Sequence, residues 1–93
     1  METIKIAYVD FWPEWPEENF IEPILKKKYE VVVDQQNPDI LVHSVFNKMR
    51  DTPKYKCKKI LYLGENHRPH KFGGINYSIS FDPRTDTNFQ LPS

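Results

Sequence analysis

Glu65 and Asn66 place a carboxylate and an amide directly after an apolar segment, residues 58–63, that runs into Gly64. A segment with branched and aromatic residues before a glycine is typical of a strand, and open α/β sheets bind ligands at the carboxyl ends of their strands. A carboxylate that is fixed and partly removed from water can act as a general base. Glu65 is therefore a candidate base; the alternative is a surface residue whose carboxylate caps a neighbouring amide.

Two tryptophans follow the first apolar segment of the chain. Trp12 and Trp15, with Phe11, lie in a Pro-containing turn that we expect at the same sheet edge as Glu65. Aromatic faces stack on the apolar faces of sugar rings, so these residues are candidates for a carbohydrate platform. The alternative is that they cap the core, and we expect Trp12 to be the buried one and Trp15 the freer one.

A metal site is the main alternative chemistry for the same loop. Glu65, His67 and His70 are ligand types that zinc accepts, but Pro69 separates the histidines and no fourth ligand is evident. We therefore predict no metal site, and we expect His43 to be a satisfied core or sheet-edge residue. The Gly73-Gly74 pair lacks a following helix start and is interpreted as a turn.

The positions of apolar segments and turn residues predict an α/β fold. Five strands are expected, at residues 3–10, 29–34, 39–45, 58–63 and 75–82. A helix is expected within residues 17–28, with acids in its first turn, lysines in its last and an apolar stripe of Phe20, Ile21, Ile24 and Leu25. Pro23 implies that this helix either begins late, near Glu22, or kinks.

The remaining segments are less regular in sequence. Residues 46–56 are ambiguous, because Pro53 would end any helical turn formed there. Residues 83–93 are polar, contain two prolines and predict an extended or frayed tail. The order of elements favours one Rossmann-like three-layer domain, residues 1–93, with a mostly parallel sheet.

Composition excludes several classes of protein. Lys plus Arg and Asp plus Glu are equal at 13 each, so no global positive field favours nucleic acid. The single Cys57 allows no internal disulfide and fits a reducing compartment. No apolar run approaches the roughly 20 residues of a membrane span, and no signal peptide is evident. We expect a soluble, cytoplasmic protein.

A family resemblance extends through most of the chain. The segment Gly64, Glu65, Asn66 with Pro69 after it, followed by Tyr77-x-Ile79-x-Phe81-Asp82, resembles the amino-terminal half of α-1,3-fucosyltransferases, the family 10 glycosyltransferases. Residues 5–12 resemble the opening strand and Trp-containing turn of that family, residues 37–41 the entry to its third strand, and residues 91–92 the end of a later segment. The order and spacing of these elements together make the resemblance specific.

The resemblance implies one half of a GT-B architecture and a role in an inverting fucosyltransferase. Glu65 would be the general base, and Trp12, Trp15, Asn66 and Arg68 would be acceptor-binding candidates. GDP-fucose would be the donor, held by a C-terminal domain that would follow the tail. The chain is then expected to bind a glycan acceptor, to hold no cofactor and to be inactive alone. The alternative is a stand-alone carbohydrate- or protein-binding domain that has lost catalysis.

Overall fold

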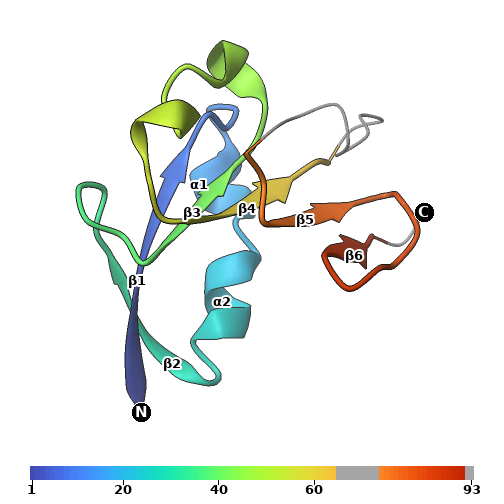
Figure 1. Cartoon of the computed structure of the whole chain (residues 1–93). Helices are drawn as coiled ribbons and strands as arrows, with labels where there is room; N and C mark the ends of the chain where they lie inside the picture. The colour runs from blue at the N-terminus through green and yellow to red at the C-terminus, as the bar shows by residue number, and fades with distance from the viewer. Residues whose placement is uncertain (65–73, 92–93) are drawn as a thin grey trace.

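The computed structural model describes residues 1–64 and 74–91. Within them, six strands form one parallel sheet in the order β2-β1-β3-β4-β5-β6 (Figure 1). The strands are β1 (Glu2–Val9), β2 (Tyr29–Val33), β3 (Ile40–His43), β4 (Lys58–Tyr62), β5 (Tyr77–Ser80) and β6 (Asn88–Gln90). The predicted Rossmann-like α/β class is confirmed, and the five predicted strands are all present.

The connection between β2 and β3 is short because the two strands pair with different halves of β1. β2 pairs with Glu2 to Ile6, whereas β3 pairs on the other side with Ile6 to Val9. Residues 34–39 therefore only have to cross β1. The amides of Asp34 and Asp39 donate to the Ile6 and Lys5 carbonyls at 2.9 and 2.8 Å, so the crossing continues the backbone pairing on both sides.

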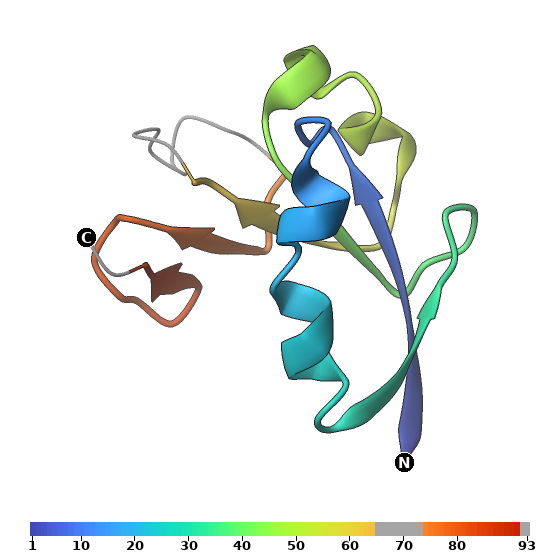
Figure 2. The same cartoon turned by 180° about the vertical axis from the view of Figure 1, so that it is seen from behind.

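The segment after β1 forms two short helices where one was expected. These are α1 (Trp15–Glu18) and α2 (Ile21–Leu25), and Figure 2 shows both in front of the sheet. Asn19 separates them, because its Oδ1 accepts hydrogen bonds from the amides of Ile21 and Glu22 at 3.0 and 3.3 Å. An Asn at this position satisfies backbone donors that a helix start leaves open. Pro23 then falls in the first turn of α2, where proline is tolerated.

This break changes which side chains reach the core. Ile21 is 6% exposed and Leu25 packs against the core, as the predicted stripe requires. Phe20 and Ile24 are 38% and 56% exposed, so half of the stripe prediction is wrong. A continuous helix would have carried all four on one face. Phe20 instead precedes α2 and packs edge-on against Trp15 and Tyr62, with ring centroids 6.3 and 5.4 Å apart.

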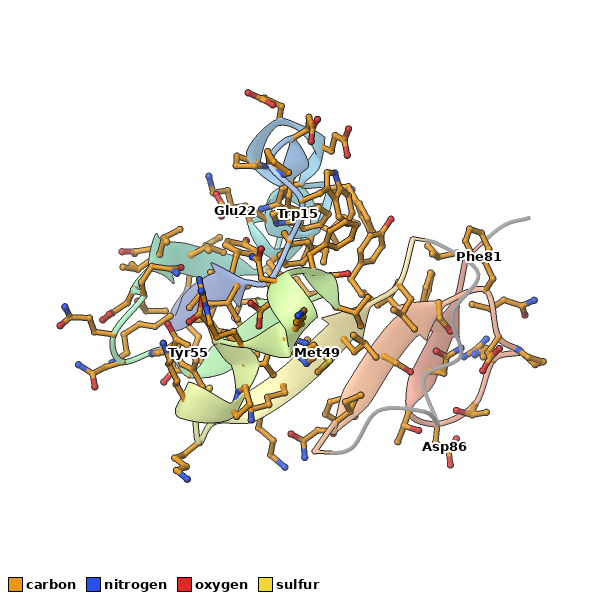
Figure 3. All side chains as sticks on the ribbon, turned by 90° about the horizontal axis from the view of Figure 1, so that it is seen from above. Trp15, Glu22, Met49, Tyr55, Phe81 and Asp86 are labelled. Atoms are coloured by element: carbon orange, nitrogen blue, oxygen red, sulfur yellow. The ribbon has the colours of Figure 1, made fainter. Side chains whose placement is uncertain are left out.

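The opposite face of the sheet is covered by two 3₁₀ turns, η1 (Phe46–Met49) and η2 (Thr52–Lys54). Figure 3 shows Trp15 and Glu22 on one side of the sheet, and Met49 and Tyr55 on the other. The ambiguous segment 46–56 is therefore two short turns, and the domain has three layers.

The core lies on both faces of the central strands. Ile6, Trp15, Ile21 and Val42 form the buried cluster beneath the helices. Successive residues of a strand point to opposite faces of the sheet. On the face of the 3₁₀ turns, the fully buried strand residues include Ala7, Leu41 and Leu61. β4 is less buried than predicted, because Lys58 at its start is exposed and Leu61 is its one buried residue.

The end of the chain contains a strand that the sequence did not predict. Asn88–Gln90 forms β6 and pairs in parallel with β5. Asn88 holds the connection: its Oδ1 accepts from the Ser78 and Ser80 hydroxyls at 2.7 and 2.8 Å, and its Nδ2 donates to the Asp82 carbonyl at 3.0 Å. The expected extended tail is thus extended and ordered into the sheet as far as residue 91.

No helix in the described part of the chain is long and apolar enough to cross a membrane.

Candidate functional site

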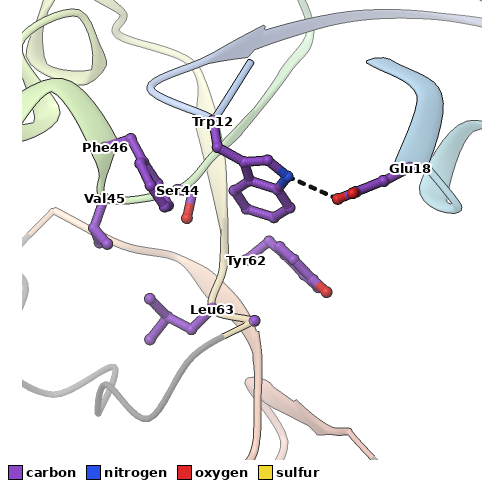
Figure 4. A pocket seen from close by; sticks show the side chains of 8 residues that line it. Trp12, Glu18, Ser44, Val45, Phe46, Tyr62 and Leu63 are labelled. Atoms are coloured by element: carbon purple, nitrogen blue, oxygen red, sulfur yellow. Dashed lines mark hydrogen bonds between the residues drawn. The ribbon is translucent and has the colours of Figure 1, made fainter. Parts of the chain in front are cut away.

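A pocket of about 460 Å³ opens at the carboxyl edge of the sheet. The last residue of β4, residues that follow β1, β3 and β4, and one residue of α1 line it (Figure 4). The lining residues are Trp12, Glu18, Ser44, Val45, Phe46, Tyr62, Leu63 and Gly64. This is the edge at which open α/β sheets bind ligands.

Trp12 forms one wall of the pocket and is held by a charged partner. Its Nε1 donates to Glu18 Oε2 at 2.7 Å, a short bond of the charge-assisted kind (Figure 4). Its ring centroid lies 5.4 Å from that of Phe46 and 6.1 Å from that of Tyr62. The indole is therefore fixed at its polar end, with two aromatic rings close by.

The expected roles of the two tryptophans are reversed. Trp15, predicted to be the freer one, is 3% exposed and does not line the pocket. Its ring stacks on Phe11 with centroids 4.0 Å apart and planes 8° apart, beneath the start of α1. Trp12, predicted to be buried, is half-buried and faces the pocket. Both follow the same strand, and only the start of α1 at Trp15 decides which ring turns to the core.

Tyr62 supplies a second aromatic surface, with a hydroxyl that stays protonated. Burial raises the pKa of Tyr62, and the negative charge of Glu18 raises it further. The neutral phenol can donate and accept hydrogen bonds beside the Glu18 carboxylate. The pocket therefore presents aromatic faces next to a carboxylate and a hydroxyl.

Gly64 is the last described residue before the predicted base, and it lines the pocket. A Cβ built on Gly64 would lie 3.2 Å from both Cε1 and the hydroxyl oxygen of Tyr62, closer than ordinary contact. Glycine at this position therefore lets the end of β4 pass close to the Tyr62 ring. Glu65, Asn66 and Arg68 lie outside the described residues.

Metal-binding groups can be examined only in the described residues. There, no group of three His, Cys, Asp or Glu side chains is placed to hold a metal ion. His67 and His70, weighed as zinc ligands with Glu65, lie outside that range. His43 is 0% exposed in the interior strand β3, so it is a core residue, not a residue at the sheet edge.

Sequence reasoning missed Glu18 and Phe46 as pocket residues. Glu18 was counted among the acids at a helix start, where they complement the helix dipole. Nothing in that pattern indicates that one of them turns back six residues to the Trp12 indole. Phe46 belongs to the segment whose structure was ambiguous, so its position at the sheet edge could not be assigned.

A comparison with protein-family models gives one match. Residues 6–92 match the alpha-(1,3)-fucosyltransferase FucT N-terminal domain. The chain belongs to this family. The match spans β2 to β6, the second half of β1 and the pocket-lining residues described above. The resemblance seen in the sequence is therefore confirmed at the level of the fucosyltransferase N-terminal domain. Comparisons with curated proteins and with solved structures gave no match.

Proposed function

We propose that this fucosyltransferase N-terminal domain binds the glycan acceptor of an inverting fucosyl transfer. The observation that carries the proposal is the pocket at the carboxyl edge, in which Trp12, Phe46 and Tyr62 surround a space beside Glu18. Aromatic rings pack on the apolar faces of sugar rings, and a carboxylate accepts hydrogen bonds from sugar hydroxyls. Family membership supplies the reaction class.

Glu65 is the proposed general base of the transfer. The acceptor oxygen attacks the anomeric carbon of fucose, the bond from that carbon to the β-phosphate oxygen breaks, and GDP leaves with the electron pair. The acceptor hydroxyl loses its proton to the Glu65 carboxylate in the same step. Support comes from Gly64, the preceding residue, which lines the pocket and has no side chain to obstruct a ligand. Asn66 and Arg68 remain proposed acceptor contacts.

The donor, GDP-fucose, is proposed to bind a separate C-terminal domain. A family defined by an N-terminal domain implies such a partner domain in the full enzyme. The isolated chain is then inactive, because the leaving group and the base are supplied by different domains. A cytoplasmic location is part of the same proposal.

Binding of simple glycosides to the isolated chain tests the acceptor role. We expect methyl β-galactoside or methyl β-N-acetylglucosaminide to receive saturation transfer in NMR from the parent chain. Trp12→Ala should abolish that transfer, because it removes one wall of the pocket and the partner of Glu18.

Phe89→Ala is the matched control, since Phe89 is an aromatic residue of β6 that is 66% exposed and outside this pocket. It should leave the transfer intact. No transfer in the parent chain, or transfer that survives Trp12→Ala, contradicts an acceptor site at this pocket.

A further inference from the structure

Asp10, the residue after β1, is a buried acid in an uncommon backbone conformation. It is 4% exposed, and its φ of 59° lies in the left-handed region. A buried carboxylate is costly unless hydrogen bonds replace the water it has lost. The partners of Asp10 therefore indicate what the fold gains from keeping an acid there.

Those partners all belong to the far end of the β3–β4 connection. Asp10 Oδ2 accepts from the Thr52 hydroxyl at 2.7 Å, from the Thr52 amide at 2.8 Å and from the Asp51 amide at 3.2 Å. Asp51 and Thr52 lie 41 and 42 positions after Asp10 in the sequence. The carboxylate thus holds the start of η2 against the end of β1.

The main chain of Asp10 holds the near end of the same connection. Its carbonyl accepts the Phe46 amide at 2.9 Å. Asp10 therefore binds both residue 46 and residues 51–52 with different groups, and the segment between them is closed into a loop.

That loop contains three consecutive non-glycine residues in the left-handed region. Asn47, Lys48 and Met49 have φ values of 53°, 55° and 53°. For L-residues this conformation is unfavourable, and it persists only where the surroundings enforce it. The hydrogen bonds of Asp10 hold both sides of the loop, and the Arg50 amide closes it from within by donating to the Asn47 carbonyl at 3.1 Å.

The hydrogen bonds of Asp10 to Phe46, Asp51 and Thr52, here called the Asp10 clamp, bear directly on the pocket. Phe46 begins the clamped loop, and Trp12 lies two residues after Asp10; both line the pocket, with ring centroids 5.4 Å apart. The position of each ring relative to the other therefore depends on the contacts of Asp10. No described group of Asp10 itself lines the pocket.

We propose that Asp10 is a positioning residue that fixes Trp12 and Phe46 relative to each other and so sets the affinity of the pocket for its acceptor. The affinity part rests on the proposed acceptor function. The positioning part does not, and it can be measured without a ligand.

The test uses the full chain labelled with 5-fluorotryptophan. The chain has two tryptophans, so ¹⁹F NMR should give two signals, and Trp12→Phe assigns them. We expect Asp10→Asn and Thr52→Val to shift or broaden the Trp12 signal more than the Trp15 signal. Thr52→Val removes one donor and keeps the carboxylate, so it decides the question if Asp10→Asn does not fold.

Asp34→Asn is the matched control. Asp34 Oδ1 also accepts two backbone amides, those of Gln36 and Asn37 at 3.1 and 3.0 Å, but in an exposed turn outside the pocket. This variant should leave the Trp12 signal in place. An unchanged Trp12 signal in both Thr52→Val and a folded Asp10→Asn overturns the positioning role.

A glycoside titration of the same variants tests the effect on affinity. We expect binding of the methyl glycosides to weaken about tenfold in Asp10→Asn, less in Thr52→Val and not at all in Asp34→Asn. A moved Trp12 signal with unchanged affinity overturns the affinity part. A moved signal in a chain whose parent binds no glycoside supports positioning and contradicts the acceptor function.

Discussion

His43 shows how a single buried side chain can make the stability of this domain depend on pH. It is 0% exposed, and its Nδ1 lies 3.0 Å from the Ser44 carbonyl, to which it donates. Its Nε2 has no hydrogen-bond partner among the described residues. Burial lowers the pKa of His43, the positive charge of Lys59 lowers it further, and the Ser44 carbonyl and Asp10 oppose both. A proton added at Nε2 would enter a buried site that offers it no described acceptor.

Acidification should therefore destabilise the domain through His43. A lowered pKa in the folded state means that the unfolded chain binds the proton first, so the stability contribution is complete above about pH 6.5 and is lost as the pH falls through the folded-state value. We expect the free energy of unfolding from urea titrations to fall between about pH 8 and about pH 5.

His43→Gln should flatten that dependence, even though the variant is less stable at every pH. If the free energy of unfolding changes with pH by the same amount in the parent chain and in His43→Gln, the pH dependence arises from other groups.

At the scale of elements, five of the six described strands were predictable, whereas β6 and most of the connections were not. β1, β3 and β4 carry apolar residues on both faces, a pattern that local sequence expresses directly. The turn at Asn47–Met49 lies between two residues, Phe46 and Asp51, whose amides donate to Asp10 far earlier in the chain, a contact that no local pattern reports. Glu18 likewise lies at the pocket through a side-chain contact, the hydrogen bond that it accepts from Trp12 six residues earlier. Long-range contacts decide the loops, and the pocket is made largely of loops.

The left-handed turn gives a prediction at this scale. Lys48 is exposed, and its φ is 55°. Glycine adopts this left-handed conformation without steric strain, because it has no Cβ. We expect Lys48→Gly to stabilise the chain by about 1 kcal/mol in chemical denaturation, because it removes the unfavourable contact of the left-handed form.

Lys26→Gly is the control, since it removes the same charge at a residue whose φ is −63°. It also removes the surface ion pair of Lys26 with Glu22 at 3.4 Å, a type of contact that contributes little to stability. It should destabilise by about 0.5–1 kcal/mol, as glycine does in ordinary helical backbone. Destabilisation of similar size in both variants would show that the turn carries no relievable strain.

At the scale of the whole molecule, this N-terminal domain supplies an aromatic pocket at the carboxyl edge of its sheet, and its sequence shows no glycine-rich diphosphate motif. Its sequence contains three glycines, at positions 64, 73 and 74, and their spacing does not match a glycine-rich phosphate-binding motif. The described helices are four and five residues long, too short to provide a strong dipole at an amino terminus. Membership in a fucosyltransferase N-terminal domain family implies a C-terminal partner domain in the full enzyme.

The isolated chain should therefore neither bind GDP-fucose with measurable affinity nor hydrolyse it. Isothermal titration calorimetry with GDP and with GDP-fucose measures this directly. A fusion of the chain to a donor domain of the same family provides the positive control, because it should bind both nucleotides. Micromolar binding to the isolated chain would place the donor site within these 93 residues.

The most direct test of the central claim is the turnover of that fusion with Glu65→Gln. Gln keeps the shape of Glu65 but cannot take a proton, so we expect kcat to fall about 100- to 10,000-fold while the KM for acceptor stays near the parental value. Glu18→Gln is the comparison, and it should change mainly the KM for acceptor, because Glu18 holds Trp12 in the pocket. Two results would contradict Glu65 as the base. One is parental turnover in Glu65→Gln, and the other is a large loss of kcat in Glu18→Gln that Glu65→Gln does not show.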